Sequence, residues 1–336
     1  MSDRIPYSPI TINWTLTFRC NFSCMHCYSR VEKAQELETE QVKEIMRKVA
    51  KYKVPFINYG GGEPLLRKDL FELTAYATSL GYNVSMNTNA FLMTNENAKK
   101  AKESGFKTVG ISIDSTEPEV HDRFRNTPGS HRRAIDAAKY LRDEGVRLTV
   151  SSVICKINSR DFAGLVRQAK EMGAEQISLH NYKCTGNGMS NKDELDLSPD
   201  EWMDFYKKAI EFKADEKDIR ISFDDPITAS IHHDPEKKVV NGSTCGKLSL
   251  NIRANGDVTP CGFIPVVIGN LLVDDLKDLW DNSNVLERMR NKKPKEKCLT
   301  CKHYEECLGG CTARAYATTG DFNSPDPHCW VGRDNP

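Results

Sequence analysis

Three cysteines in the stretch CNFSCMHCYS are spaced as ligands of a metal centre. Cys20, Cys24 and Cys27 are separated by three and then two residues. A structural zinc ion would need a fourth protein ligand, whereas a [4Fe-4S] cluster held by three thiolates keeps one iron open to another molecule. His26 lies between the last two cysteines and is a possible fourth ligand, because imidazole is the commonest metal ligand. Both a zinc site and an open iron-sulfur cluster are therefore compatible with the spacing.

A second group of cysteines lies in the C-terminal part of the chain. Its middle part has the spacing C-x2-C-x5-C-x3-C, and its members are Cys245, Cys261, Cys298, Cys301, Cys307, Cys311 and Cys329. Pairs of the form C-x2-C are common zinc ligands, so a zinc ribbon is the physical alternative to iron-sulfur clusters here. The C-terminal part is predicted to bind metal in either case.

The composition excludes several classes of partner. Lys plus Arg and Asp plus Glu both number 47, so the net charge is zero and no overall field attracts nucleic acid or an anionic membrane. The N-terminus lacks the basic and apolar regions of a signal peptide, and no long apolar run predicts a membrane span. We therefore expect a cytoplasmic protein, in which twelve cysteines indicate metal binding or catalysis rather than disulfides.

The elements that must position these cysteines form repeated βα units. Short β-branched stretches alternate with charged amphipathic stretches, which predicts helices around a parallel sheet. Strands are expected at residues 11–18, 54–59, 82–88, 108–114, 147–154 and 175–182. Helices are expected between them at residues 38–52, 70–81, 95–105, 131–145 and 161–173. Six units are fewer than the eight of a closed barrel, so the fold class is α/β with a partial (β/α)6 TIM-type barrel.

The chain is expected to have three parts. Residues 1–195 form the barrel core, and residues 196–244 form a bridging segment with one helix at 198–214. Residues 245–336 form a small cysteine-rich domain with a hairpin that turns at Asn255-Gly256 and a helix at 269–283.

Polar residues also follow the second, third and fourth strands. The segment Gly60-Gly61-Gly62-Glu63-Pro64 combines glycines, which permit close backbone approach, with a carboxylate that can accept hydrogen bonds from an ammonium group. Asn87, Ser112 and Asp114 stand at the next two strand ends. Chemistry in such a barrel lies at the C-terminal ends of the strands, although capping of the strand end is an equal explanation for Asn87 and Asp114.

Together, the first cysteine triplet and these segments resemble the radical S-adenosylmethionine (SAM) superfamily. The resemblance implies that Cys20, Cys24 and Cys27 hold a [4Fe-4S] cluster whose open iron binds SAM, and that reductive cleavage of SAM gives a 5′-deoxyadenosyl radical. His26 would pack near the cluster, and Ala90 stands where the family usually has glycine. The implied SAM-binding residues are His26, Gly61, Gly62, Glu63, Asn87, Ser112 and Asp114.

The C-terminal cysteines, with G-D-V-x-P-C and G-N-L-x4-L-x2-L-W, resemble the SPASM extension of this superfamily. The resemblance implies a distal auxiliary [4Fe-4S] cluster on Cys298, Cys301, Cys307 and Cys329, and a nearer one on Cys245, Cys261 and Cys311. Full members supply a fourth cysteine to the near cluster, at the position of Val239 in this chain. The near cluster is thus open at one iron or completed by another group, for which His232, His233, Asp234 and Cys184 are candidates. Cys155 is expected to be a small apolar core residue.

The resemblance leaves the substrate open between two enzyme classes. The first is a small molecule, such as a tetrapyrrole side chain or a sugar, which is favoured because residues 185–188 (TGNG) are similar to loops of tetrapyrrole-type members. The second is a peptide that is oxidised, crosslinked or epimerised. Lys183, Arg123 and Arg125 are candidates to bind a substrate carboxylate. Gly262 replaces an aspartate of sulfatase-maturing members and argues against that activity.

A non-enzymatic alternative is an iron-sulfur electron carrier or scaffold, against which the segment Gly61 to Pro64 argues because a carrier has no use for a SAM site. For the enzyme we expect a flavodoxin- or ferredoxin-type reductant as partner and sensitivity to oxygen. The catalytic residues themselves are not predicted.

Overall fold

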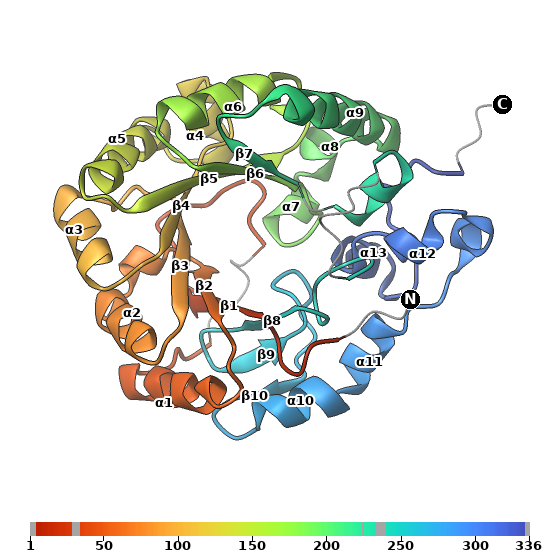
Figure 1. The fold of residues 1–336 in the computed structure, drawn as a ribbon. Helices are drawn as coiled ribbons and strands as arrows, with labels where there is room; N and C mark the ends of the chain where they lie inside the picture. The colour runs from red at the N-terminus through yellow and green to blue at the C-terminus, as the bar shows by residue number, and fades with distance from the viewer. Residues whose placement is uncertain (1–4, 29–33, 224, 233–239, 333–336) are drawn as a thin grey trace.

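The computed structural model describes residues 5–28, 34–223, 225–232 and 240–332. Its centre is a curved sheet with the strand order β10-β9-β8-β1-β2-β3-β4-β5-β6-β7 (Figure 1). The six predicted parallel strands are confirmed as β1 (Thr11–Thr17), β2 (Phe56–Gly61), β3 (Asn83–Thr88), β4 (Thr108–Ser112), β5 (Arg147–Ile154) and β6 (Gln176–Asn181). The predicted partial barrel is therefore confirmed.

The five helices predicted between these strands are also present and follow the outer face of the sheet in Figure 1. They are α1 (Thr39–Ala50), α2 (Leu70–Ser79), α3 (Asn95–Glu103), α5 (Ser130–Asp143) and α6 (Phe162–Glu171). In α1, the buried residues Val42, Ile45, Met46 and Val49 recur at the spacing of one helical face. Burial of such apolar stripes against the sheet fixes the helices on its outside.

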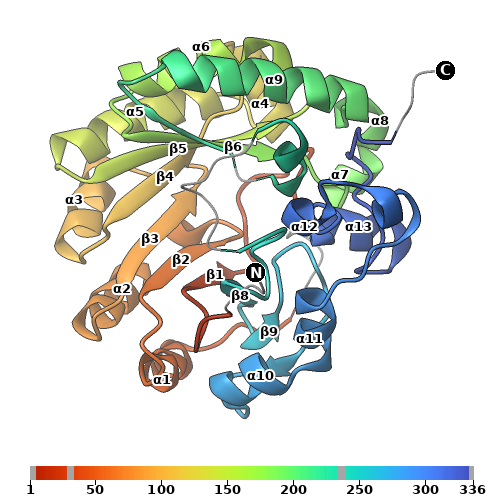
Figure 2. The ribbon, with the colours of Figure 1, turned by 45° about the vertical axis from the view of Figure 1, so that its right-hand side comes forward.

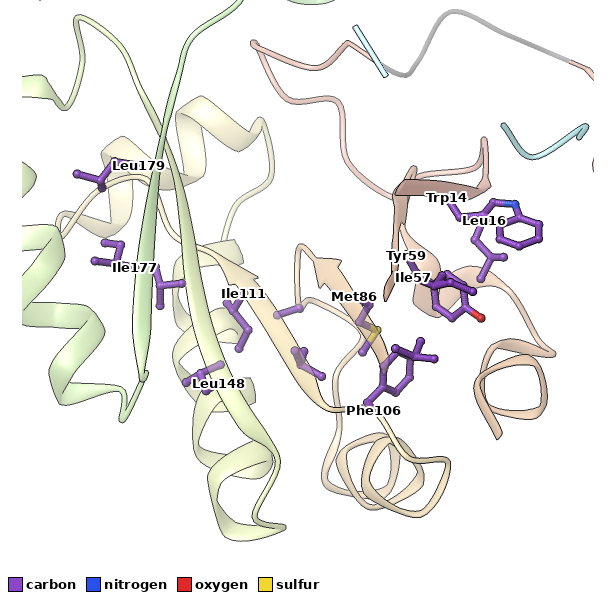
Figure 3. Close-up of a cluster of buried hydrophobic side chains, with 14 of the residues drawn as sticks. Trp14, Leu16, Ile57, Tyr59, Met86, Phe106, Ile111, Leu148, Ile177 and Leu179 are labelled. Atoms are coloured by element: carbon purple, nitrogen blue, oxygen red, sulfur yellow. The ribbon is translucent and has the colours of Figure 1, made fainter. Parts of the chain in front are cut away.

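Alternation along the strands separates a core from a polar interior. Ile12 and Leu16 of β1 are fully buried in the core, whereas Asn13 and Thr15 between them line an interior cavity. Figure 3 shows the apolar side chains of successive strands gathered in one cluster. On the interior face, Asn58 of β2 donates to Asn13 Oδ1 (3.3 Å). The interior of the barrel is thus an open chamber with polar strand residues in its wall rather than a packed apolar core.

The sheet extends beyond the six predicted strands on both sides. β7 (Arg220–Ser222), in the expected bridging segment, pairs in parallel with β6. β8 (Ser249–Ile252) pairs in parallel with β1 and turns back into β9 (Asp257–Thr259), so the predicted hairpin is confirmed. One sheet therefore runs through all three expected parts, and the division at residues 195 and 244 stays a prediction. Strands of three or four residues are too short to show a periodic pattern in the sequence.

The helix predicted at residues 269–283 is wrong in its first half. Gly269–Asn270 form β10, which pairs with β9. Helix α10 (Leu276–Asn282) begins only after Asp275, whose side chain accepts a hydrogen bond from the Lys277 backbone N–H (2.8 Å). The aspartate is a strong N-cap and sets the helix start at that point.

The remaining helices include one that was predicted and several that were not. The predicted one, α9 (Pro199–Asp215), is confirmed together with its capping box between Ser198 and Glu201. The others are α4 (Pro118–Arg125), α7 (Asn187–Ser190), α8 (Lys192–Leu195), α11 (Asn284–Arg290), α12 (Tyr304–Cys307) and α13 (Thr312–Thr319). In the described part of the chain, no helix has the length and apolar character needed to span a membrane.

The C-terminal helices lie where the curved sheet does not close. Figures 1 and 2 show α12 and α13 beside the gap between the two edges of the sheet. Helix α12 packs on the short 3-10 helix η3 (Pro226–Ser230), which follows β7. This packing brings the C-terminal cysteines to the open side of the barrel interior.

Candidate functional site

A single interior cavity of about 530 Å³ brings the first cysteine triplet together with part of the C-terminal group. All of the residues predicted to contact SAM line this cavity except Asp114. The cysteines in its wall are Cys20, Cys24, Cys27, Cys245, Cys261 and Cys311. The two cysteine sets predicted for the SAM-binding cluster and the near auxiliary cluster therefore share one chamber.

The other four C-terminal cysteines line a second cavity. It is small, about 20 Å³, and its wall contains Cys298, Cys301, Cys307 and Cys329. These are the four residues that the family resemblance assigned to a distal cluster. In the chain, helix α13 lies between the first three of them and the last, Cys329. The structure thus divides the seven C-terminal cysteines into the same two sets that the motif implied.

The cysteines surround cavities rather than single points. Within the described residues, no group of three His, Cys, Asp or Glu side chains is placed to hold one metal ion. A zinc ion needs its ligands to converge on one atom, whereas each cysteine of a [4Fe-4S] cluster binds a different iron and the sulfurs are spread around the cubane. The donor sets fit clusters better than zinc.

Residues 185–191 hold the loop that carries the first triplet. The Asn187 backbone N–H donates to the Cys27 carbonyl oxygen (2.8 Å), and its side chain donates to the Cys24 carbonyl oxygen (3.2 Å). Asn191 Nδ2 donates to the Met25 carbonyl oxygen (2.9 Å). At Gly186, with φ of +56°, a Cβ atom would lie 2.6 Å from the Cys27 carbonyl oxygen. The TGNG segment therefore supports the loop that carries Cys24 and Cys27. Because these contacts are made within the chain, they do not favour a tetrapyrrole over a peptide as substrate.

The glycines before Glu63 allow β2 to approach β1. A Cβ atom on Gly62 would lie 2.0 Å from the Arg19 carbonyl oxygen. The Gly62 N–H donates to the Thr17 carbonyl oxygen (2.9 Å), and the Glu63 N–H donates to that of Arg19 (2.8 Å). The close approach that these glycines permit is thus to the chain leading into Cys20, which fixes Glu63 relative to the first cysteine.

Glu63 is buried in the cavity wall with its carboxylate held in one orientation. It accepts hydrogen bonds from Thr88 Oγ1 (2.6 Å), the Asn89 N–H (2.8 Å) and the Leu65 N–H (3.1 Å). Burial raises the pKa of Glu63, and these three donors oppose that effect. Ala90 has a φ of +62°, in the left-handed region that glycine adopts readily and that other residues adopt rarely.

Asn89 is a site residue that the sequence analysis did not assign. Its Nδ2 donates to Asn21 Oδ1 (2.9 Å) and lies 4.0 Å from Cys20 Sγ. It joins the end of β3 to the cysteine loop. Its position two residues after Asn87, directly beyond the end of β3, was the available signal.

His26 packs as a neutral ring behind the cluster loop. Its ring stacks on that of Phe124 at a centroid distance of 4.4 Å. Burial, followed by the charge of Arg125, lowers the pKa of His26 to about 3, so the ring is neutral at physiological pH. This placement agrees with the packing role that the family resemblance implied.

Asp114 acts on the cavity through Arg125. The Arg125 Nε donates to Asp114 Oδ2 (2.6 Å), and Asp114 Oδ1 accepts from the Val153 N–H (2.8 Å). Burial disfavours the charged carboxylate, but the guanidinium holds the pKa of Asp114 below its usual value. Arg125 also lines the cavity. Burial is the larger effect on Cys24 and raises the pKa of that thiol to about 11, while the charge of Arg125 favours the thiolate form. Direct contact between Asp114 and SAM stays a prediction.

Between the two cysteine sets, the cavity wall is aromatic and carries a cation. The Tyr28 ring packs on Phe263 at a centroid distance of 4.1 Å, and Lys183 Nζ lies 4.7 Å from the centre of the Phe263 ring. A Cβ atom on Gly262 would lie 3.3 Å from Tyr28 Oη. Tyr28 and Phe263 were not assigned from the sequence, although each stands next to the cysteine motifs.

The three candidate cations for a substrate carboxylate have different surroundings. Arg123 is exposed and pairs with Glu194 at the surface, so it is the wrong choice. Arg125 is committed to Asp114. Lys183 lines the cavity, and within the described residues its ammonium contacts the Asn181 carbonyl oxygen (3.3 Å) and forms no ion pair with a carboxylate. Lys183 is therefore the candidate that the structure retains.

The candidates for a fourth ligand of the near cluster find little support. His232 lines neither cavity, and His233, Asp234 and Val239 lie outside the described residues. Cys184 also lines neither cavity, and its thiol donates to Asp196 Oδ2 (3.2 Å). Cys155 is fully buried in the core, as predicted.

A buried ionic network joins the two cysteine cavities. Arg314 pairs with Asp225 (Nη1 to Oδ2, 2.6 Å) and, through Nε, with Asp326 Oδ1 (2.9 Å). Asp326 Oδ2 also accepts from the Cys311 N–H (2.7 Å). Arg314 is 3 % exposed and Asp326 is 1 % exposed. The network ties η3, α13 and the C-terminal loop together around the cysteines.

Comparisons with known proteins agree with this geometry. A family model described as the radical SAM superfamily matches residues 14–169, and one described as an iron-sulfur cluster-binding domain, SPASM, matches residues 244–302. The chain is 31 % identical to an AdoMet-dependent heme synthase of Methanosarcina barkeri over 96 % of both chains. It is 28 % identical to a PqqA peptide cyclase of Bradyrhizobium diazoefficiens, over 96 % of this chain and 86 % of that one.

A solved structure shares the fold. SuiB of Streptococcus suis bound to S-adenosylmethionine matches with a TM-score of 0.81 and 18 % identity, over 97 % of this chain and 78 % of that one. The cysteine sets, the family models and the relatives point to the same cofactors, namely [4Fe-4S] clusters and SAM. The chain therefore belongs to the radical SAM superfamily and is a SAM-dependent enzyme with a C-terminal SPASM domain.

Proposed function

We propose that this enzyme modifies a carboxylate-bearing peptide at an unactivated C–H bond, within the cavity that the two cysteine sets share. The observation that carries the proposal is the convergence of Cys20, Cys24 and Cys27 with Cys245, Cys261 and Cys311 on one chamber. Chemistry begun at the first set would take place beside the second.

Cys20, Cys24 and Cys27 would hold the SAM-binding cluster, which supplies a carbon-centred radical when SAM is bound and an electron is delivered. The Glu63 carboxylate would accept hydrogen bonds from the SAM amino group, since its orientation is already set by Thr88 and Asn89.

Asn87 and Ser112 line the same wall and offer further polar contacts. The aromatic wall of Tyr28 and Phe263 would exclude water from the space between the two cysteine sets. The chain's own contribution is thus to place the reactants and keep the chamber dry.

Two observations favour a peptide. One relative is named a peptide cyclase and covers 96 % of this chain. The cavity of about 530 Å³ is of the size that holds one drug-sized ligand, and SAM must occupy a large share of it. The space that is left suits one side chain or chain terminus entering from a peptide.

A small-molecule substrate, such as a tetrapyrrole with a carboxylate side chain, is the second candidate. It is favoured by the identity of 31 % to a heme synthase over nearly the full length of both chains. Lys183 would serve either substrate, because both carry a carboxylate that an ammonium can bind.

The test is anaerobic reconstitution followed by incubation with SAM and dithionite. We expect 5′-deoxyadenosine to form, and its yield to rise when peptides encoded beside the gene are added, with a mass change in the peptide. A yield that rises with carboxylated tetrapyrroles and with no peptide would select the second candidate. Absence of 5′-deoxyadenosine from fully reconstituted protein would contradict both.

Glu63→Gln is expected to weaken SAM binding about ten- to hundredfold, which corresponds to loss of one hydrogen bond to a charged group. The Asn89 N–H now donates to the Glu63 carboxylate. With the glutamine amide nitrogen in that place, two N–H donors would face each other. Equilibrium binding of SAM to the reconstituted protein checks this. Glu72→Gln, on the exposed face of α2, is the matched control and should bind SAM normally.

Lys183→Met is expected to raise the KM for the carboxylate substrate about ten- to hundredfold, because a charge-assisted hydrogen bond is lost. SAM cleavage without substrate should continue, since Lys183 lies on the wall with Phe263. Steady-state kinetics with the native substrate and with its amidated form check the prediction. An equal response of both forms to the substitution would contradict a carboxylate contact. Arg123→Met, at the surface, is the control.

A further inference from the structure

Lys292 places a buried ammonium beside the C-terminal cysteines. Its Nζ is shielded from solvent and has no hydrogen-bond partner in the described part of the chain. The backbone at this point is anchored, because Tyr304 Oη donates to the Lys292 carbonyl oxygen (3.0 Å) and the Lys293 N–H donates to Asn323 Oδ1 (2.9 Å). A cation is therefore held in the protein interior without an acceptor.

The position of the ammonium relative to the cysteines follows from Gly309. A Cβ atom built on Gly309 would lie 3.4 Å from Lys292 Nζ and 3.8 Å from Cys298 Sγ. Both groups therefore lie within van der Waals reach of the same point. Gly309 also lines the cavity that the four distal cysteines share. The missing side chain of this glycine leaves the space between the ammonium and the sulfur open.

Burial lowers the pKa of Lys292, and the Asp326 carboxylate together with the thiol groups of Cys307, Cys311 and Cys298 opposes that effect. Asp326 is already committed to Arg314 and to the Cys311 N–H. Cys298 and Cys307 belong to the distal set, and Cys311 belongs to the near set. Lys292 thus lies in the electrostatic field of both auxiliary sites, with more of the distal than of the near ligands around it.

A buried cation without an acceptor destabilises a folded protein unless an anion satisfies it. Cluster sulfides and thiolates are anionic acceptors, and hydrogen bonds and charge at the sulfurs set the reduction potential of an iron-sulfur cluster. A positive charge near an iron-sulfur cluster favours the reduced state of that cluster, which holds one more electron.

We propose that Lys292 is an electrostatic tuning residue of the auxiliary clusters, donating to sulfur of the distal cluster and stabilising its reduced form. The inference rests on the assignment of Cys298, Cys301, Cys307 and Cys329 to that cluster. It goes beyond the proposed function because it holds for any substrate. Lys292 raises the potential of the distal cluster more than that of the near one, since its Nζ and Cys298 Sγ both lie close to Gly309, which lines the distal cavity.

The experiment is a potentiometric titration followed by electron paramagnetic resonance on the full chain with all clusters reconstituted. For Lys292→Met, the ratio of reduced to oxidised distal cluster at a fixed potential is expected to fall about tenfold, which is a shift of about 59 mV to more negative potential for a one-electron couple. Lys292→Arg keeps the charge and should stay near the wild type. Lys293→Met, an exposed neighbour, should show no shift.

Iron content separates the possible failures. Wild-type protein that binds markedly fewer than about twelve iron atoms would overturn the cluster assignment and the inference with it. Lys292→Met with full iron and an unchanged potential would overturn the inference alone. Loss of iron only in the Lys292 variants would show a structural role in place of tuning.

Discussion

Cys24→Ala is expected to abolish formation of 5′-deoxyadenosine from SAM and to leave about eight of the twelve iron atoms per chain. Cys24 is 7 % exposed, lines the shared cavity and lies within the electrostatic influence of the buried Arg125. Two thiolates are too few to hold the SAM-binding cluster, and without it no electron reaches the sulfonium. Iron analysis and chromatography of the reaction with dithionite measure both effects.

Cys155→Ala is the matched control for this substitution. Cys155 is also buried, but it lies in the core and lines neither cysteine cavity. It should keep full iron and SAM cleavage. Cys298→Ala provides the converse result, since it should lose about four iron atoms from the distal site while SAM cleavage continues. SAM cleavage that survives Cys24→Ala would refute the ligand assignment.

Arg314→Met is expected to lower the free energy of unfolding by about 3–5 kcal/mol, because it leaves Asp225 and Asp326 as buried charges without a partner. Arg314 bonds both carboxylates, and Asp326 in turn accepts from the Cys311 N–H. The auxiliary sites should therefore lose iron before the SAM-binding site does. Denaturant unfolding and iron analysis of the anaerobic protein check both expectations.

Arg132→Met tests whether burial of the ion pairs is the cause of the large loss of stability that is expected for Arg314→Met. Arg132 also pairs with an aspartate, Asp136 (3.2 Å), but its side chain is 81 % exposed. Surface ion pairs of this kind contribute about 0–1 kcal/mol, so this variant should keep its stability and its iron. Equal destabilisation by the two substitutions would contradict the role of the buried network.

The two kinds of substitution together separate chemistry from architecture. Cys24→Ala removes a ligand of one cofactor, whereas Arg314→Met removes the link between η3 and the C-terminal loop. The enzyme depends on both the cysteine ligands and the buried ionic network, because the segments that form the auxiliary sites have little apolar core of their own. The buried members of their small separate cluster are Ile264, Met289, Ala313 and Phe322.

Much of the fold could be predicted because its pattern is local. The apolar spacing of α1 and the capping box of Ser198 and Glu201 act over a few residues, and both are confirmed. The short strand β10 was missed because Gly269–Asn270 carry no periodic signal, and the predicted helix was extended through them. Local patterns in the sequence determine the long helices and strands. A short strand depends on its pairing partner elsewhere in the chain.

The cysteine spacing by itself indicated metal binding, but it left zinc and iron-sulfur clusters open. The choice of radical SAM chemistry came from the combination of the cysteine motifs with the segment at Glu63, which resembles that superfamily. The sequence also placed Glu63 and Asn87 at strand ends, where parallel strands direct their residues to one edge.

Only the tertiary structure decided how these groups meet. Pairing of β8 with β1 brings Cys261 into the chamber that contains Cys20, and no periodicity in the chain encodes that pairing. The support of the cysteine loop by Asn187 likewise joins residues that are far apart in sequence, since Asn187 and Cys24 are 163 residues apart. Such contacts arise from the packing of distant segments, which no local pattern in the sequence encodes.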